Sequence, residues 1–144
     1  MRYFRHVGLV FGLLVGSACV PSDPLSALSG DDKTFLFGDT GTNAPFLGQT
    51  VDGGPLNCYP QRMNQAYVLI DTDRDLWLDS IRPSGVERHK ILSVKTMKAG
   101  FVVKAQNGVS VPFNLVIERK GRDLASISWD GAPAEMYRRC DSVG

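Results

Sequence analysis

The sequence predicts an all-β protein, a single small antiparallel meander that forms a closed or nearly closed eight-stranded barrel. Short apolar segments follow one another at short intervals from residue 67 onward. Within several of them apolar and polar residues alternate, as in strands with one buried face. No segment shows a sustained apolar stripe with the 3.6-residue period of a helix. A meander of this length hides its edges when it closes on itself.

Eight segments are predicted to be strands. The first follows a stretch rich in Pro, Ser and Asp, and the last ends at a cysteine. Residues 38–66, between the first two, contain several Gly, Pro and Asn residues and predict a long irregular segment. In chain order the predicted strands are residues 33–37, 67–70, 76–81, 89–97, 101–106, 110–118, 124–129 and 134–140.

The alternation is clearest in residues 110–118. Pro112 lies on the polar face and cannot donate to the ladder, so we expect an edge or a bulge there. The opposite face carries four apolar residues, which are Val111, Phe113, Leu115 and Ile117.

Glycine-containing pairs predict the turns between these strands. Asn107-Gly108 is the strongest signal for a two-residue hairpin turn, because both residues tolerate a positive φ. Lys120-Gly121 and Asp130-Gly131 predict two further turns. Strands joined in this way lie side by side in chain order, so the turns support a meander.

The beginning of the chain has the composition of an export signal. Two arginines precede an apolar run from Val7 to Val15, and small residues lead up to Cys19. The apolar run is far shorter than the ~20 residues of a membrane-spanning helix. A cysteine after such a signal resembles the lipobox of bacterial lipoproteins, in which that thiol receives the lipid. The resemblance implies a signal peptide over residues 1–18 and acylation, of the palmitate type, at Cys19.

Three details of the signal bear on this expectation. The lipobox has an aliphatic residue three positions before the cysteine, where this chain has Gly16, while Ser17 and Ala18 fit. Gly16 and Ala18 also suit ordinary signal peptidase, so a soluble secreted protein is the alternative. Val20 rather than Asp follows the cysteine, which under the enterobacterial sorting rule implies the outer membrane.

The chain contains three cysteines, an odd number for an exported protein. If the lipid consumes Cys19, Cys58 and Cys140 are left to form a disulfide in an oxidising compartment. Such a bridge closes a loop of about 80 residues, for which the chain-entropy model gives roughly 4–5 kcal/mol of stabilisation. We therefore expect a lipid attachment site and flexible tether over residues 19–32 and a barrel domain over residues 33–144.

The charge of the chain argues against nucleic acid as a partner. Lys and Arg number 16 and Asp and Glu 15, and Arg2 and Arg5 leave with the predicted signal. The mature chain is thus close to neutral, whereas a nucleic-acid surface needs clustered positive charge. No motif predicts a cofactor. The expected partners are the lipid bilayer, through Cys19, and an envelope protein or a small apolar ligand.

The layout of the predicted strands, with a last strand ending in Tyr137-Arg138-Arg139-Cys140, resembles the lipocalin-like barrels among small bacterial lipoproteins. The resemblance covers residues 33–140. The chain lacks the Gly-x-Trp signature of lipocalins near its first strand, where Phe35 and Phe37 stand instead. Barrels of this type include carriers of small apolar ligands and protein inhibitors, so the resemblance alone does not choose between these functions.

One pair of motifs points to catalysis. Asp39-Thr40-Gly41 resembles the Asp-Thr-Gly loop of aspartic proteases, in which two such aspartates share a proton. Gly121-Arg122-Asp123 resembles the segment that supports this loop in retroviral-type proteases. The chain has one Asp-Thr-Gly, so this alternative requires a homodimer with Asp39 as the catalytic residue. The other interpretation is a plain loop in which Asp39 accepts main-chain hydrogen bonds, and we expect no enzyme activity.

A run of carboxylates resembles part of a calcium loop, in which alternating oxygens converge on the cation. The glycine and the last glutamate of such a loop are replaced here by Leu76 and Arg82. The other interpretation is a polar hairpin turn followed by a strand with one carboxylate on its exposed face. The four carboxylates are Asp71, Asp73, Asp75 and Asp79.

His89 is the only histidine that follows the predicted signal, and it stands directly after Glu87 and Arg88. We expect it to be exposed to solvent, because no nucleophile elbow or free thiol accompanies it. Several aromatic residues are candidates either for filling the core or for lining a ligand cavity. They are Tyr67, Trp77, Phe113 and Trp129.

These observations predict a non-enzymatic lipoprotein of the outer membrane, whose barrel acts as a binding module facing the periplasm or the cell surface. Residues 38–66 are the expected contact surface, because loops on rigid barrels carry recognition, and Gly53-Gly54-Pro55 is the expected tip. The alternative function is inhibition of a lysozyme or protease through that tip. The further alternative is the dimeric aspartic protease.

Overall fold

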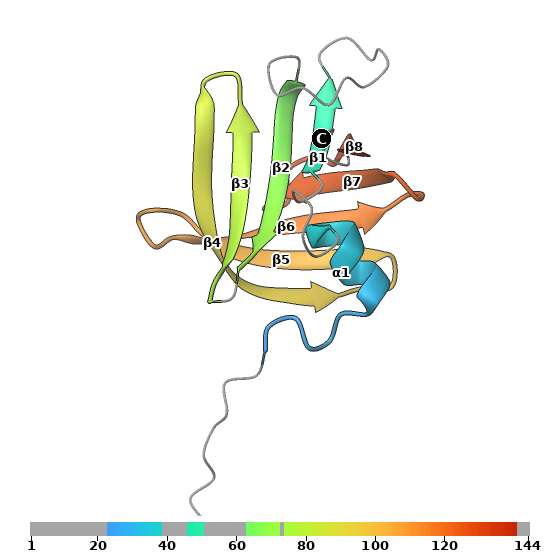
Figure 1. Ribbon diagram of the computed structural model, residues 1–144. Helices are drawn as coiled ribbons and strands as arrows, with labels where there is room; N and C mark the ends of the chain where they lie inside the picture. The colour runs from blue at the N-terminus through green and yellow to red at the C-terminus, as the bar shows by residue number, and fades with distance from the viewer. Residues whose placement is uncertain (1–22, 39–45, 51–62, 73, 141–144) are drawn as a thin grey trace, which may run out of the picture.

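The structure is a computed structural model, and it describes residues 23–38, 46–50, 63–72 and 74–140 (Figure 1). In this part of the chain, no helix is long and apolar enough to cross a membrane. The elements are α1 (Gly30–Phe37), β1 (Phe46–Thr50), β2 (Met63–Asp71), β3 (Leu76–Arg82), β4 (Gly85–Thr96), β5 (Gly100–Gln106), β6 (Pro112–Arg119), β7 (Leu124–Trp129) and β8 (Glu135–Cys140).

The strands form one antiparallel sheet. From β2 to β8, each strand pairs with the next along the chain. The sheet curls into a nearly closed barrel, and β1 lies between its two edges. It pairs with β2 along all five of its residues and with β8 only through Phe46, Leu47 and Gly48. Figure 1 shows this curvature, with β2 and β3 upright and β5 to β7 running across them. The predicted all-β fold and single antiparallel meander are therefore confirmed.

The prediction of a first strand over residues 33–37 is wrong, because these residues belong to helix α1. Ser29 caps the helix: its hydroxyl accepts a hydrogen bond from the main-chain N of Asp32, and the Asp32 carboxylate accepts one from the main-chain N of Ser29 (3.2 Å each). The other seven predicted strands are confirmed. The position between β2 and β8 is taken by β1, from the segment that was predicted to be irregular.

Strand β4 connects the two halves of the sheet. Its residues 85–90 pair with β3 and its residues 90–96 pair with β5. The register with β5 shifts between Ile91 and Ser93. Such a bulge bends a strand and increases its twist, and it leaves Leu92 between them 41% exposed. The bend lets one strand serve both the upright and the crossing part of the sheet (Figure 1).

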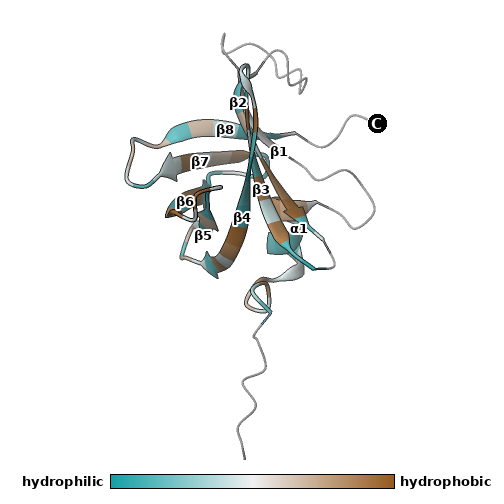
Figure 2. Ribbon diagram, turned by 90° about the vertical axis from the view of Figure 1, so that its left-hand side faces the viewer, coloured by the Kyte–Doolittle hydropathy of each residue, from teal (hydrophilic) through white to brown (hydrophobic). Residues whose placement is uncertain are grey.

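Alternating apolar side chains fill the interior of the barrel. In β6, Phe113, Leu115 and Ile117 point inward and are buried, as predicted, whereas Val111 precedes the strand and is exposed. Pro112 is the first residue of β6, a position that tolerates a missing N–H, so the expected edge or bulge is replaced by the start of a strand. In Figure 2 the strands carry both hydrophobic and hydrophilic stretches, with β7 mostly hydrophobic.

The predicted turns differ in their outcome. Asp130 and Gly131 both have a positive φ (42° and 80°), as the two-residue turn requires. The loop at Asn107-Gly108 is longer than predicted, and its left-handed residue is Ser110 (φ 64°). The Asn107 side chain accepts hydrogen bonds from two main-chain N–H groups of the loop (3.1 and 2.9 Å). This side chain organises a wider loop in place of the tight turn.

Residues 23–37, which we call the N-terminal plug, cover one end of the barrel. Residues 23–32 were expected to belong to a flexible tether with little to bury. That expectation is wrong for these residues, because apolar side chains from the whole plug join the same core as the strands. Residues 19–22 lie outside the described residues. The buried side chains of the plug are Leu25, Leu28, Phe35, Leu36 and Phe37.

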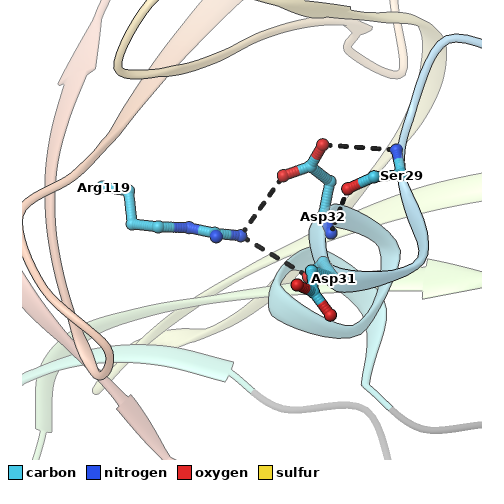
Figure 3. A network of polar contacts seen from close by, with 4 residues as sticks. All are labelled: Ser29, Asp31, Asp32 and Arg119. Carbon is cyan, nitrogen blue, oxygen red and sulfur yellow. Dashed lines mark hydrogen bonds and ion pairs between the residues drawn. The ribbon is translucent and has the colours of Figure 1, made fainter.

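Arg119, the last residue of β6, fastens the plug to the barrel (Figure 3). Its Nη2 atom lies 3.4 Å from the Asp32 carboxylate. Its guanidinium also lies 4.2 Å from the centre of the Phe35 ring. The Phe35 ring stacks in turn on Phe101 of β5 (6.1 Å). The plug therefore sits where β5 begins and β6 ends. We call this the plugged end of the barrel and the opposite end the far end.

Candidate functional site

The far end of the barrel contains a group of aromatic side chains around His89, which we call the aromatic cluster. The rings of Phe113 and Trp129 are stacked, with centroids 4.1 Å apart and planes 13° apart. The His89 imidazole meets both rings edge-on, at 5.0 and 6.0 Å. Tyr67 contacts Trp129 and Tyr137, at 6.2 and 5.4 Å. Residues far apart in the sequence thus come together because β2, β4, β6, β7 and β8 each supply one ring.

The register of the sheet explains how these rings fit. Phe113 of β6 lies opposite Ala105 of β5, and Tyr137 of β8 lies opposite Ala125 of β7. Each large inward ring therefore has a small inward neighbour on the next strand. Alternation of large and small side chains is how small barrels fill their interior.

His89 is 6% exposed, so the expectation that it is exposed to solvent is wrong. Its position in β4 alternates with the outward Arg88, and the inward side of the strand is covered by aromatic rings. Neither imidazole nitrogen has a hydrogen-bond partner in the described part of the chain, and the nearest carboxylate oxygen, of Glu87, lies 3.9 Å from Nε2. Burial lowers the pKa of His89. The imidazole is therefore neutral at pH 7, with one donor and one acceptor nitrogen.

The other polar groups around the cluster differ in how they are paired. The Tyr67 hydroxyl accepts a hydrogen bond from the Gln65 amide (2.6 Å), and the Tyr137 hydroxyl donates one to Glu135 (3.4 Å). Burial raises the pKa of both tyrosines, so both are neutral phenols. The Ser80 hydroxyl is buried and, like His89, has no hydrogen-bond partner among the described residues. An unpaired buried polar group costs about 1–3 kcal/mol.

Buried His89 predicts a pH-dependent stability. The folded-state pKa lies below the ordinary value of about 6.5. At a pH between these two values, His89 binds more protons in the unfolded chain than in the folded protein. The part of the free energy of unfolding that depends on neutral His89 is therefore fully present above about pH 6.5, and it is lost as the pH drops toward the folded-state pKa. We expect urea unfolding to show this slope in the natural protein and to lose it in His89→Phe. Equal slopes in the two proteins between pH 5 and 7 would contradict this assignment.

The carboxylates of the suggested calcium loop are engaged by basic side chains instead. Asp75 pairs with Lys90 (2.9 Å), and Asp79 accepts two hydrogen bonds of 2.7 Å from Arg88. Asp79, which was expected on an exposed face, is 8% exposed. Asp71 belongs to β2, and Asp73 lies outside the described residues. Within the described ranges, no three His, Cys, Asp or Glu side chains form a group that could hold a metal ion.

Several predicted residues lie where the structure describes little or nothing. Cys140 is the last residue of β8, and its backbone lies opposite Phe46 of β1. The disulfide, the lipid site, the catalytic alternative and the loop tip all stay predictions. Their other residues, outside the described part of the chain, are Cys19, Asp39, Gly53, Gly54, Pro55 and Cys58.

The structure divides the aromatic candidates into two groups. Tyr67, Phe113 and Trp129 meet in the aromatic cluster, whereas Trp77 lies outside it, with the guanidinium of Arg88 6.0 Å from its ring. The cluster residue that the sequence interpretation misplaced is His89. Its alternation with Ile91, which is also inward and buried, was the available signal.

A separate cavity of about 590 Å³ lies at the plugged end, between the plug and the turn that joins β2 to β3. Lys33, Arg74 and Lys90 line it together with Asp23, Asp71 and Asp75. Because charges of both signs line the cavity, its lining favours neither an anionic nor a cationic ligand.

No protein-family model, curated protein or solved structure matches this chain.

Proposed function

We propose that this protein is a non-enzymatic binding module of the bacterial cell envelope, held at the outer membrane by a lipid on Cys19. In this proposal β1 completes the closed barrel, and the aromatic cluster binds a small, mainly apolar ligand. The observation that carries the binding proposal is His89, buried among aromatic rings with both nitrogens unpaired in the described part of the chain. Such a combination of an apolar lining with a few polar groups is typical of ligand sites.

The cluster favours a flat aromatic ligand that carries a hydroxyl group. Trp129 is only partly buried, so its stacked ring forms the outer layer of the cluster. A ligand ring that packs there gains stacking and apolar burial. A ligand hydroxyl that reaches His89 forms a hydrogen bond with one of its imidazole nitrogens, which have no partner in the described chain. This hydrogen bond fixes the orientation of the ligand.

Binding of 1-naphthol tests this proposal against naphthalene, which has the same rings without the hydroxyl. We expect 1-naphthol to quench the fluorescence of Trp129 and to bind roughly 3- to 10-fold more tightly than naphthalene, as one net hydrogen bond allows. The measurement uses a Trp77→Phe background, so that one tryptophan reports. In His89→Phe, which keeps the ring packing, the preference should disappear. If neither compound changes the fluorescence, the aromatic cluster is not a ligand site.

A protein partner is the second candidate, as in an inhibitor of a lysozyme or protease. Three exposed valines favour it, because they lie on the hairpin ends of the far end: Val86 (61% exposed), Val109 (79%) and Val111 (54%). The Gly53-Gly54-Pro55 tip predicted from the sequence precedes β2 and belongs to the same proposal. Purified lysozymes and proteases should then be inhibited by the natural protein and at least tenfold less by Val109→Asp. A panel of such enzymes that all keep full activity excludes this candidate.

A further inference from the structure

We infer that the plugged end of the barrel lies against the lipid bilayer and that the aromatic cluster faces away from it. This inference rests on the lipid anchor at Cys19 proposed above. The partner is the headgroup layer of the membrane that holds the lipid.

The chain between the proposed lipid and the folded domain is short. Three residues separate Cys19 from Asp23. Even fully extended, this segment spans at most about 14 Å from one Cα atom to the other. From Asp23 onward the chain is held, because the Asp23 carboxylate accepts a hydrogen bond from the main-chain N of Leu25 (2.9 Å) and Leu25 is 5% exposed.

The N-terminal plug stays packed on the barrel, so it does not lengthen this segment by detaching. Leu25 and Leu28 share one core with residues of the strands. The capping box at Ser29 stabilises the helix that follows, and Arg119 of β6 holds this helix to the barrel through Asp32 (Figure 3) and through the Phe35 ring. Release of the plug would expose its buried side chains to water and leave Arg119 without these contacts.

This segment is shorter than the barrel is high. Strand β6 has eight residues, and a strand rises about 3.3 Å per residue. With the usual tilt of barrel strands, the two ends lie about 20 Å apart. A segment of about 14 Å that begins at the plugged end does not let the far end reach the bilayer. The aromatic cluster and Val109 therefore face the aqueous side.

The turns of the plugged end suit a headgroup layer. These turns join β2 to β3, β4 to β5 and β6 to β7, and they carry exposed basic side chains together with exposed acidic ones, Asp71 and Asp123. Because both signs are present, the orientation rests on the length of the chain and not on net charge. Basic groups next to a membrane are attracted by anionic lipids. The basic residues of these turns are Arg74, Lys98, Lys120 and Arg122.

The test compares two fluorophore positions on the full-length, lipid-bearing protein in vesicles of phosphatidylcholine and phosphatidylglycerol. A bimane label is placed at Lys98→Cys, at the plugged end, or at Val109→Cys, at the far end. Lipids with a nitroxide headgroup quench a nearby label. We expect at least threefold stronger quenching at position 98. Natural protein treated with the same label gives the background from Cys58 and Cys140.

A matched variant with ten Gly and Ser residues inserted after Ser22 shows whether the short segment is the cause. The difference between the two positions should fall by at least half in this variant, and an unchanged difference overturns the argument from chain length. The intact mass of each sample reports the lipid on Cys19. Equal quenching at both positions with an acylated Cys19 overturns the orientation alone. An unacylated Cys19 overturns the proposed anchor and this inference with it.

Discussion

Replacement of Gly100 by Ala is expected to lower the free energy of unfolding by about 3 kcal/mol, at the upper end of the usual cost of overpacking. Gly100 is the first residue of β5 and lies opposite Glu118 of β6. A Cβ atom at this position would collide with the main-chain oxygen of Ile117 and lie 2.7 Å from the Cα atom of Glu118. Both are main-chain atoms, so a change of side-chain rotamer cannot relieve the collision.

Hydrogen bonds on both sides of Gly100 oppose a shift of the two strands. The main-chain N of Met97 donates to the oxygen of Gly100 (2.7 Å), and the main-chain N of Arg119 donates to the oxygen of Ala99 (2.8 Å). Arg119 also holds the N-terminal plug through Asp32. A shift of β6 away from β5 therefore weakens the turn and the contact with the plug together.

Urea unfolding followed by circular dichroism measures this cost, with Gly108→Ala as the matched control. A Cβ atom at Gly108 meets nothing within 4 Å, and its φ lies outside the left-handed region. The control should change the free energy of unfolding by less than about 0.5 kcal/mol. If Gly100→Ala is as stable as Gly108→Ala, the close approach of β5 to β6 is not required for the fold.

The strands from residue 63 onward were predictable because one physical pattern is repeated in each of them. Inward side chains are apolar and outward ones polar, and this alternation survives wherever one face of the sheet is covered. Residues 113, 115 and 117 illustrate it, since each is buried between exposed or half-buried neighbours. Turn residues predicted where the strands end. This prediction was correct at Asp130-Gly131, whereas at Asn107-Gly108 the Asn107 side chain organises a longer loop than predicted.

Helix α1 was not predictable from periodicity, because it is too short to show any. Its eight residues place three buried side chains in a row, at 35–37, which fits a buried strand as well as a helix end. The signal that distinguishes them is local: Ser29 followed three residues later by Asp32 satisfies the first N–H groups of a helix. The burial of Leu25 and Leu28 depends on tertiary packing, which no local pattern reports.

The candidate site was predictable only in its apolar part. Tyr67, Phe113 and Trp129 were expected inside the barrel because aromatic residues bury large areas. His89 was expected to be exposed because no catalytic partner accompanies it in the sequence, yet its place in β4, two residues before the buried Ile91, puts it on the inward face. Its meeting with Phe113 and Trp129 depends on the register of three strands, and one sequence does not fix that register.

Replacement of Leu36 by Ala is expected to lower the free energy of unfolding by about 3 kcal/mol, within the range for large-to-small changes in a core. Leu36 is 1% exposed in the middle of the buried run of α1. A helix of eight residues is too short to be stable by itself, so α1 depends on this packing. The loss of the isobutyl group leaves a cavity that the surrounding strands, fixed by their pairing, fill only in part.

Lys33→Ala is the matched control, because it lies on the same helix, is exposed, and is replaced by a residue of similar helix propensity. Its cost should stay below about 0.5 kcal/mol. Urea unfolding measures the global effect, and the rate of thermolysin cleavage within residues 23–37 measures local release of the plug. If Leu36→Ala costs no more than Lys33→Ala, the plug contributes nothing to the core. Residues 20–37 would then act as a long tether, and the short connection to the membrane on which the orientation of the barrel depends would not exist.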